Sequence, residues 1–330
     1  MKFRLGMATR EAYGRKLAEL GALHPEIVVV SGDLAKSTYV YLFRERFPER
    51  FFELGISEQN MMGVAAGLAL CGKTVFVSTF AVFATSRCYD QIRVSIAQPH
   101  LNVKVVASHG GITVGEDGAS AQAIEDVALM CALPGFTVIV PADEVETAQA
   151  VEVAARTYGP FYIRTGRPRF PVVFDEGYRF ELGRAALLRP GNDVTLVANG
   201  IMVSVALEAA EILAREGVSA RVLAMATVKP IDREAIAAAA EETGAIVTAE
   251  EHLIQGALGA AVAQVVAETV PVPVEFVGIR DRYGESGKPE ELMRKFGLTP
   301  EDVATAARRA MARRDALARR HRFLAAELQP

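Results

Sequence analysis

Residues 57–79 read SEQNMMGVAAGLALCGKTVFVST, and this stretch contains the pattern that decides the fold. From Met61 to Leu70 the residues are apolar or small on every side of a helix, and such a helix is buried within a protein or an interface. After Gly72 comes a short run rich in β-branched residues, which is typical of a strand buried on both faces. The stretch therefore predicts a helix followed directly by a strand of a mostly parallel sheet.

The same alternation of strand and helix patterns extends over the first half of the chain. Short runs of β-branched residues predict strands, and the longer segments between them have the pattern of helices. Such alternation predicts an α/β fold, in which a mostly parallel sheet carries helices on both faces. The predicted strands are 27–31, 74–79, 103–107, 137–140 and 161–164, and the predicted helices are 8–22, 57–71, 80–98, 120–132 and 143–157.

A stretch punctuated by Gly and Pro, residues 169–191, interrupts the alternation and predicts a linker. It separates an expected first domain at 1–168 from an expected second domain at 192–330. The second domain is again predicted to be a mostly parallel sheet flanked by helices. Its predicted strands are 193–199, 220–225, 245–250 and 274–278, and its predicted helices are 202–216, 231–242, 256–269 and 300–327.

The composition predicts a soluble, globular and cytoplasmic protein. Apolar residues make up 51% of the 330 residues and charged residues 23%, and the formal net charge is −4. Proteins that bind nucleic acid usually carry a basic excess, so we expect no nucleic-acid partner. The start of the chain lacks a signal-peptide pattern, and no apolar run reaches the roughly 18 residues of a membrane span. We therefore expect no membrane association.

Residues that mark other common chemistries are scattered or missing. The sequence contains no G-x-G-x-x-G, H-E-x-x-H or G-x-S-x-G motif. Its five histidines and three cysteines lack metal-ligand spacing, so we expect no metal site in this chain. The last predicted helix is basic, which favours a solvated or intersubunit face, with an anion-binding surface as the alternative. Its arginines are Arg308, Arg309, Arg313, Arg314, Arg319, Arg320 and Arg322.

Three segments contain residues that could serve a function as well as the fold. Ser57 and Glu58 begin the apolar helix, where they fit either a cap and a dipole-matching charge or a carboxylate placed for proton chemistry. Phe80 and Phe83 follow a strand and lie three residues apart, so they form either core or a flat wall for a heteroaromatic ring. Residues 108–122 form a long glycine-rich loop with a histidine and two acids, which is typical of a functional loop.

Taken together, these segments resemble the C-terminal half of transketolases, and especially the separate C-terminal subunits found where that enzyme is split over two chains. The resemblance rests on the S-E-Q-N-M-M-G-V-A-A-G-L-A helix and the loop G-I-T-V-G-E-D-G-A at 111–119. It implies a thiamine-diphosphate pyrimidine-binding fold followed by a transketolase C-terminal-like domain. Shorter matching motifs are A-T-R at 8–10, S-T-F-A-x-F at 78–83, Y-I-R at 162–164 and G-E-S-G at 284–287.

The resemblance implies a site for the aminopyrimidine of thiamine diphosphate. Glu58 matches the glutamate that hydrogen-bonds N1′ of the aminopyrimidine and so promotes loss of the thiazolium C2 proton, which makes Glu58 a catalytic candidate. Phe80 and Phe83 match residues that stack on the pyrimidine. Ile56 matches the neighbour that helps to set the bent shape of the cofactor.

The resemblance also implies a sugar-phosphate site. His109 and Asp117 match residues that hold the sugar hydroxyls, His109 also contacts the phosphate, and both are further catalytic candidates. Arg10, Ser37 and Arg164 correspond to the remaining phosphate contacts, and a planar guanidinium is suited to gripping phosphate oxygens. Ser37 fits equally well as a turn or helix-cap serine.

Two departures from the family pattern bear on function. Ala121 stands where the family usually has a histidine near the donor carbonyl, which leaves the donor sugar open. Residues 32–34 read G-D-L and lack the final glycine of the G-D-G motif that helps the family to hold Mg²⁺ and the diphosphate. We therefore expect the Mg²⁺ site on a partner chain, an N-terminal-half transketolase subunit, in an α₂β₂ assembly with helix 61–70 near the interface.

The function that the resemblance implies is transfer of a two-carbon ketol unit from a ketose phosphate to an aldose phosphate, with activity only in the presence of the partner. A close alternative is the β subunit of a 2-oxo acid dehydrogenase E1 component, which shares the architecture and the cofactor glutamate. A deoxyxylulose-phosphate synthase fits less well, since it normally carries both halves in one chain. A non-catalytic regulatory subunit is the alternative from another class, and Ala121 is the one sequence hint for it.

Overall fold

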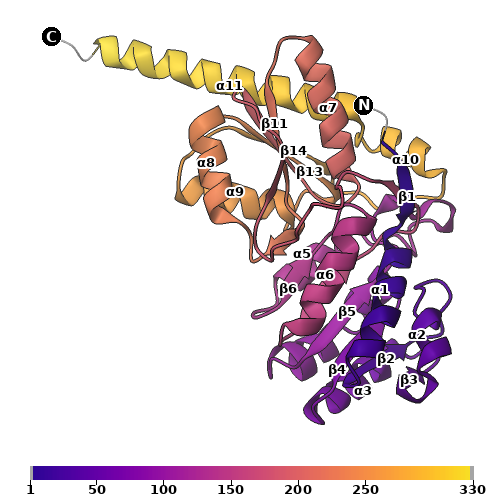
Figure 1. Ribbon diagram of the computed structural model, residues 1–330. Helices are drawn as coiled ribbons and strands as arrows, with labels where there is room; N and C mark the ends of the chain where they lie inside the picture. The colour runs from indigo at the N-terminus through magenta and orange to yellow at the C-terminus, as the bar shows by residue number, and fades with distance from the viewer. Residues whose placement is uncertain (1–2, 328–330) are drawn as a thin grey trace.

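The computed structural model describes residues 3–327, with side chains for residues 3–320, and arranges them in two α/β units (Figure 1). The first unit contains a seven-stranded sheet in the order β12-β6-β7-β5-β4-β2-β3. Its neighbouring strands run parallel except β12, which is antiparallel to β6. The predicted α/β fold is thereby confirmed. The strands are β2 (Ile27–Ser31), β3 (Phe51–Glu53), β4 (Thr74–Ser78), β5 (Val103–Ala107), β6 (Thr137–Ile139), β7 (Phe161–Arg164) and β12 (Thr227–Lys229).

Helices cover both faces of this sheet because its strands bury alternate side chains on opposite sides. Val28 and Val30 of β2 lie in a core cluster with Met61 of α3. Val29 of the same strand lies in a separate cluster with Tyr13 of α1 and the apolar face of α6. The helices are α1 (Thr9–Leu23), α3 (Glu58–Leu70) and α6 (Glu144–Arg156), and the shorter α2 (Tyr41–Arg46) and 3₁₀ turn η1 (Pro48–Arg50) precede β3.

The prediction of one continuous helix at 80–98 is wrong. The chain there forms two π-helical turns, η2 (Phe83–Arg87) and η3 (Ile92–Ala97), on either side of the short α4 (Tyr89–Gln91). A π turn holds an extra residue and re-aims the side chains that follow, and such turns are frequent at functional sites. The widened turn keeps the Arg87 guanidinium within hydrogen-bonding distance of the carboxylate at the start of α3.

The helix predicted at 120–132 is shorter in the structure, where α5 spans Asp126–Cys131. The backbone before it is held by partners outside the segment. The carbonyl of Ala123 accepts a hydrogen bond from the Gly111 N–H at 2.7 Å and another from the Arg164 guanidinium, also at 2.7 Å. Residues 120–125 therefore remain in a loop that lies against the glycine-rich segment.

The second unit contains a five-stranded sheet in the order β14-β13-β10-β11-β9, parallel except for β9. One core cluster packs α7 and α11 on one face, and another packs α8 and α9 on the other. The strands and helices predicted for this half are present with small shifts at their ends. These predicted elements are β10 (Val194–Ala198), α7 (Met202–Arg215), β11 (Ala220–Ala224), α8 (Arg233–Thr243), β13 (Ile246–Leu253), α9 (Leu258–Glu268), β14 (Val274–Ile279) and α11 (Pro300–Glu327). The strand β9 (Ala186–Arg189) and the helix α10 (Pro289–Lys295) were not predicted.

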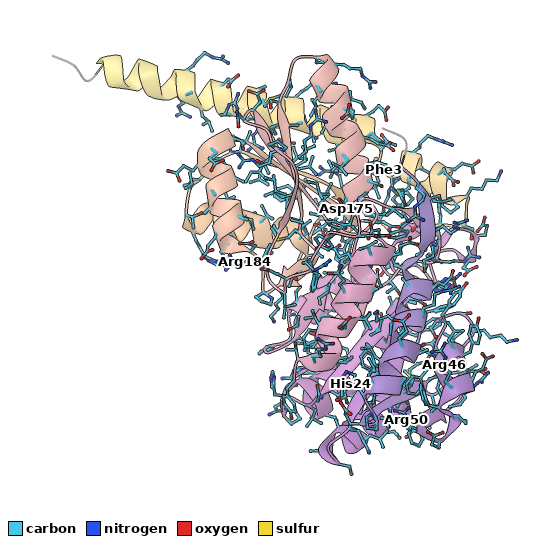
Figure 2. All side chains as sticks on the ribbon, in the orientation of Figure 1. Phe3, His24, Arg46, Arg50, Asp175 and Arg184 are labelled. Carbon is cyan, nitrogen blue, oxygen red and sulfur yellow. The ribbon has the colours of Figure 1, made fainter. Side chains whose placement is uncertain are left out.

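The segment predicted as a linker, residues 169–191, is ordered along the junction of the two units. Its strand β8 (Arg169–Pro171) pairs with β1 (Leu5–Ala8), and β9 belongs to the second sheet. Asp143 holds the segment, because its carboxylate accepts the backbone N–H groups of Val173 and Phe174 at 2.8 and 2.9 Å. Figure 2 shows Asp175 of this segment between the two units.

Helix α11 runs past the edge of the second unit (Figure 1). Most of its described arginines contact the protein itself: Arg308 bonds Glu216, Arg309 and Arg313 bond Glu275, and Arg314 donates to the Asp193 carbonyl. The side chain of Arg322 lies outside the described residues. Among residues 3–327, no helix is both long enough and apolar enough to cross a bilayer.

Candidate active site

Glu58 lies at the first turn of α3, where the chain leaves β3 through Gly55 in a left-handed conformation (φ 70°). The residue is only 5% exposed, and its Oε1 accepts a hydrogen bond from Arg87 Nη1 at 3.0 Å. Ser57 does not cap the helix with its side chain, because its hydroxyl donates to the Leu54 carbonyl at 2.7 Å. The alternative in which Ser57 caps the helix is therefore excluded, and Glu58 is a buried polar side chain at this helix start.

An open hollow adjoins this carboxylate and is lined by residues 56–60 and Arg87. Ile56 stands at its edge with 75% of its surface exposed. Gly32 directly follows β2, and a Cβ placed on Gly32 would lie 3.8 Å from Glu58 Cγ. The end of β2 is therefore next to the Glu58 side chain. Glu58 thus sits where the carboxyl ends of β2 and β3 meet, the edge at which parallel sheets bind ligands.

Three rings are stacked beside the hollow. Phe80 and His109 lie with ring centroids 3.6 Å apart at 22°, and Phe80 and Phe83 lie 5.5 Å apart at 21°. The guanidinium of Arg87 covers the Phe83 ring at 4.2 Å and bonds Glu58. The stack forms because β4 and β5 are neighbours, and the Ala81 N–H reaches the Ser108 carbonyl at 2.7 Å just beyond both strands. The structure therefore brings the predicted aromatic wall, Glu58 and His109 together.

His109 is buried with an unusual backbone, φ 63°, for a residue with a side chain. Its Nδ1 lies 2.9 Å from the Ser108 hydroxyl. Burial, reinforced by the nearby charges of Arg10 and Arg167, lowers the pKa of the His109 imidazole to about 3. The ring is therefore neutral near pH 7, and it can donate one hydrogen bond and accept another.

Cationic and polar groups collect next to His109. Arg10 donates from Nη1 to the Ser37 carbonyl at 2.8 Å and lies 5.5 Å from the centre of the Tyr39 ring. Burial lowers the pKa of Arg10, and its Nε is buried with no hydrogen-bond partner in the structure. Arg167 donates to the Val114 carbonyl at 2.6 Å, and its Nη2 lies 4.0 Å from Asp117 Oδ1. Two guanidiniums thus face the same space as His109 and Asp117.

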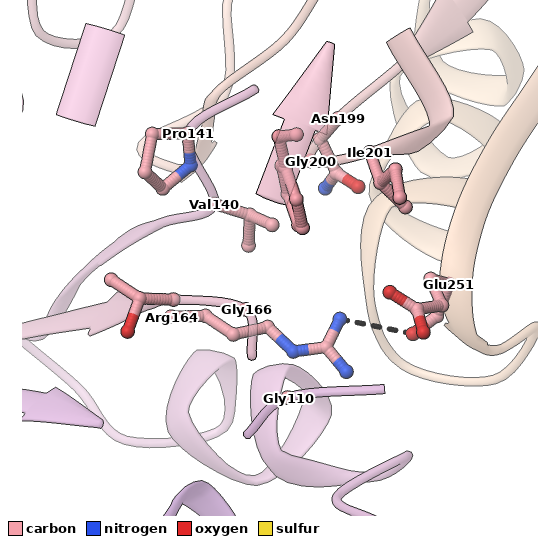
Figure 3. Close-up of a pocket in the computed structure, with 11 residues that line it drawn as sticks. Gly110, Val140, Pro141, Arg164, Gly166, Asn199, Gly200, Ile201 and Glu251 are labelled. Carbon is pink, nitrogen blue, oxygen red and sulfur yellow. Dashed lines mark hydrogen bonds between the residues drawn. The ribbon is translucent and has the colours of Figure 1, made fainter. Parts of the chain in front are cut away.

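Arg164 does not join this cluster. Its Nη1 donates to the Glu251 carbonyl at 2.9 Å (Figure 3). Its Nη2 donates to the Ala123 carbonyl, and its Nε lies 3.2 Å from Asp126 Oδ2. The cavity beside it has a volume of about 10 Å³, which is room for one water and not for a phosphate group. The structure therefore gives Arg164 a structural role in place of the predicted phosphate contact.

Two residues of the site were missed in the sequence. Arg167 lies three residues beyond Arg164. Its position as a basic residue just after a buried strand could have identified it in the sequence. Arg87 gave no such signal, because its approach to Glu58 depends on the π turn. Ala121 is buried and contributes no polar side chain, while its neighbour Gln122 donates from Nε2 to the Ile112 and Gly115 carbonyls at 3.2 Å.

Comparison with known proteins shows the family to which the chain belongs. The family described as "Transketolase, pyrimidine binding domain" matches residues 6–172, and "Transketolase, C-terminal domain" matches residues 183–303. The "Putative transketolase C-terminal section" of Methanocaldococcus jannaschii is 45% identical over 89% of this chain and 93% of its own length. The "6-deoxy-6-sulfo-D-fructose transketolase subunit SqwH" of Clostridium sp. is 42% identical over 93% of this chain and 95% of its own.

Longer relatives and a solved structure complete the comparison. Human transketolase is 40% identical over 92% of this chain, but the match spans only 49% of the human protein. A solved structure described as "Split gene transketolase, inactive beta4 tetramer" has a TM-score of 0.88 and 54% identity, and the match covers 94% of this chain and 100% of that one. The chain belongs to the transketolase family, and it comprises the pyrimidine-binding and C-terminal domains of that family.

Proposed function

We propose that this chain is the C-terminal subunit of a two-chain transketolase and takes part in moving a two-carbon ketol unit from a ketose phosphate to an aldose phosphate. The observation that carries the proposal is Glu58, a carboxylate buried at a helix start that still borders an open hollow. Such a group can hold a hydrogen bond to a heterocyclic nitrogen away from competing water. The stacked rings beside it supply a flat wall for the same heterocycle.

The residues fit the aminopyrimidine end of thiamine diphosphate. Glu58 would hydrogen-bond N1′, and Phe80 and Phe83 would pack against the ring, with Ile56 at the edge of the hollow. When bound, the cofactor supplies the carbanion chemistry, and the protein contributes orientation and electrostatics. Arg87 covers the free face of Phe83 and bonds Glu58, so its guanidinium would swing outward, where half of its side chain is already exposed.

The cationic cluster fits the anionic end of a sugar. Arg10 and Arg167 present guanidiniums suited to a phosphate or a sulfonate, and the name of the Clostridium relative includes a sulfo sugar. The neutral His109 and the half-exposed Asp117 are suited to sugar hydroxyls. Ser37 offers Arg10 its carbonyl, so the serine supports the cluster through its backbone whether or not its hydroxyl touches the substrate.

A partner chain would complete the site. On α3, Gly63 and Gly67 are exposed and have nothing within 4 Å of the position of a side chain, and Leu70 is 73% exposed. This smooth face begins at the hollow beside Glu58, so a chain docked on it would also close the hollow. We infer that the partner is an N-terminal-half transketolase subunit that carries the Mg²⁺ and diphosphate site, in an α₂β₂ assembly. The split-gene neighbour is described as an inactive β4 tetramer, and this supports dependence on a partner.

Calorimetric titration of thiamine diphosphate with Mg²⁺ tests the proposal. The cofactor is titrated into this chain alone, into the chain mixed with an N-terminal-half subunit, and into the mixture made with Glu58→Ala. We expect binding only in the mixture, together with ketol transfer that the Glu58→Ala mixture lacks. Tight binding to the chain alone would contradict the split site. Turnover that survives the loss of Glu58 would contradict the catalytic assignment.

The two alternatives make different predictions in the same complex. A 2-oxo acid dehydrogenase β subunit would support pyruvate decarboxylation and would not cleave xylulose 5-phosphate. A regulatory subunit would leave turnover unchanged when Glu58 is replaced. Measuring both reactions with and without the Glu58→Ala change therefore separates the three functions.

A further inference from the structure

The glycine-rich loop that carries His109 and Asp117 rests on the C-terminal unit. Gly110 and Gly111 follow His109 directly, and each has its side-chain position filled by another residue. A Cβ on Gly110 would overlap the Arg164 side chain, and a Cβ on Gly111 would overlap the Glu251 carboxylate. The two glycines are therefore required here because Arg164 and Glu251 pack against the loop backbone.

Glu251 belongs to β13 of the second sheet and contacts the loop across the junction. Its Oε1 accepts the backbone N–H of Thr113 at 2.6 Å, at the start of the 3₁₀ turn η4 (Ile112–Asp117), and its own carbonyl accepts Arg164 Nη1 at 2.9 Å (Figure 3). Glu251 is 5% exposed, so water does not compete for these bonds. A buried carboxylate needs such a partner, and the Thr113 N–H that bonds the Glu251 carboxylate comes from the first unit, as does the Arg164 guanidinium that bonds the Glu251 main-chain carbonyl.

A second set of contacts holds the far end of the same loop. Gln122 donates from Nε2 to the Glu285 carbonyl at 3.0 Å as well as to the Ile112 and Gly115 carbonyls. Gly115 lies against residues 287–289, and Gly118 lies against Ser286. The G-E-S-G motif therefore packs on the G-E-D-G loop, which explains why both motifs recur in the resemblance to one family.

We propose that Glu251 is a positioning residue for sugar-phosphate binding, and that together with Arg164 it fixes the loop on which His109 and Asp117 stand. This gives the C-terminal unit a role at a site to which it presents none of the predicted substrate contacts. The inference rests on the proposed function only in its last step, the binding of the sugar. The anchoring of the loop depends on the fold alone and can be measured without turnover.

Glu251→Ala and Glu251→Gln test the proposal in the full two-chain complex, with Glu250→Ala as the matched control. Glu250 is also a buried carboxylate of β13 that accepts two backbone N–H groups, but these belong to Leu258 and Gly259 at the start of α9. Two readouts are needed: amide hydrogen exchange of peptides from 110–118, and KM and kcat for the ketose phosphate.

We expect Glu251→Ala to raise exchange at 110–118 and the KM about tenfold each, with kcat within about twofold, since one charge-assisted hydrogen bond is lost. Gln can still accept from Thr113 N–H, so Glu251→Gln should recover most of both effects. Glu250→Ala should loosen residues near 256–262 and leave the KM unchanged. If Glu251→Ala does not fold, a smaller rise in exchange and KM in Glu251→Gln carries the test.

Unchanged exchange at 110–118 in the Glu251 variants would overturn the anchoring. A loosened loop with an unchanged KM, or an equal rise in KM from Glu250→Ala, would overturn the positioning role. Failure of the unmutated complex to transfer ketol units would refute the proposed function instead. In that case the exchange data decide the anchoring, and calorimetric binding of the ketose phosphate decides the positioning.

Discussion

Arg164 and Arg167 lie three residues apart, and the structure predicts opposite consequences for replacing them with methionine. Arg164→Met removes the cation beside Asp126, which is fully buried and keeps only the Tyr162 hydroxyl, at 2.5 Å, as a side-chain partner. An uncompensated buried charge costs about 3–5 kcal/mol, a large part of the roughly 5–15 kcal/mol that stabilises a domain. We therefore expect Arg164→Met to lower the urea midpoint strongly.

Arg167→Met should behave in the reverse way. Its side chain is 35% exposed and its acidic partners are more exposed still, so its loss should change the free energy of unfolding by less than about 1 kcal/mol. If Arg167 holds the anionic group of the sugar, the KM should rise about 10- to 100-fold, since such charge-assisted bonds contribute about 1.5–3 kcal/mol.

Urea denaturation and steady-state kinetics of the assembled complex measure both effects. The double variant Asp126→Asn with Arg164→Met should recover part of the lost stability, because it removes the stranded charge. The reasoning is refuted if Arg164→Met keeps the urea midpoint of the unmodified chain and raises the KM instead. That result would return Arg164 to the phosphate site.

Three further predictions follow from other parts of the molecule. Glu58→Gln should lower kcat by at least about a hundredfold and leave the urea midpoint nearly unchanged, since amide and carboxylate have the same shape; activity within about tenfold would exclude its proton role. Burial lowers the pKa of His252 to about 4 from 6.5, so stability should fall as the pH drops from about 6.5 towards 4, by up to about 1.4 kcal/mol per pH unit for this one proton; an unchanged slope in His252→Gln would show that the loss comes from other groups. Gly67→Leu should block assembly with the partner chain without lowering the stability of the free chain, because the position is open; light scattering that still finds the assembled complex would remove α3 from the interface.

The sequence alone predicted those strands in which every residue is in the same environment. Strands such as β2, β4 and β5 are buried at every position, so a plain run of β-branched residues identifies them. The three-residue β12 was missed, because its pairing with β6 is set by contacts between the units and not by its own residues. The break at 80–98 was missed for a related reason, since a π turn changes the helical period only locally and leaves no clear pattern in the residues of the segment.

Site residues divide in the same way. The places of Glu58 and the two phenylalanines at helix and strand ends left their roles open, and the family resemblance assigned them to a cofactor site. In the structure they lie close together, because Arg87 covers the Phe83 ring and bonds Glu58, and Phe83 stacks on Phe80. Arg164 ends β7 and Arg167 lies just beyond it, and both carry a guanidinium, so the sequence did not show which one faces the ligand. The structure separates the two arginines by burial. Arg164 is buried, bonded to the Glu251 carbonyl and paired with the Asp126 carboxylate, so it does not face the ligand.

The strand β12 ties the solubility of the first unit to the second. It is the only element of the second half that joins the seven-stranded sheet, and it covers β6 at the outer edge of that sheet, as far as the described residues 3–327 show. A chain cut anywhere in residues 169–191 would leave the outer edge of β6 without its partner strand, and an unpaired edge is a template for pairing with other chains. Expressing the two halves separately should therefore yield a first half that aggregates. The two halves should accordingly be kept in one chain when the protein is engineered.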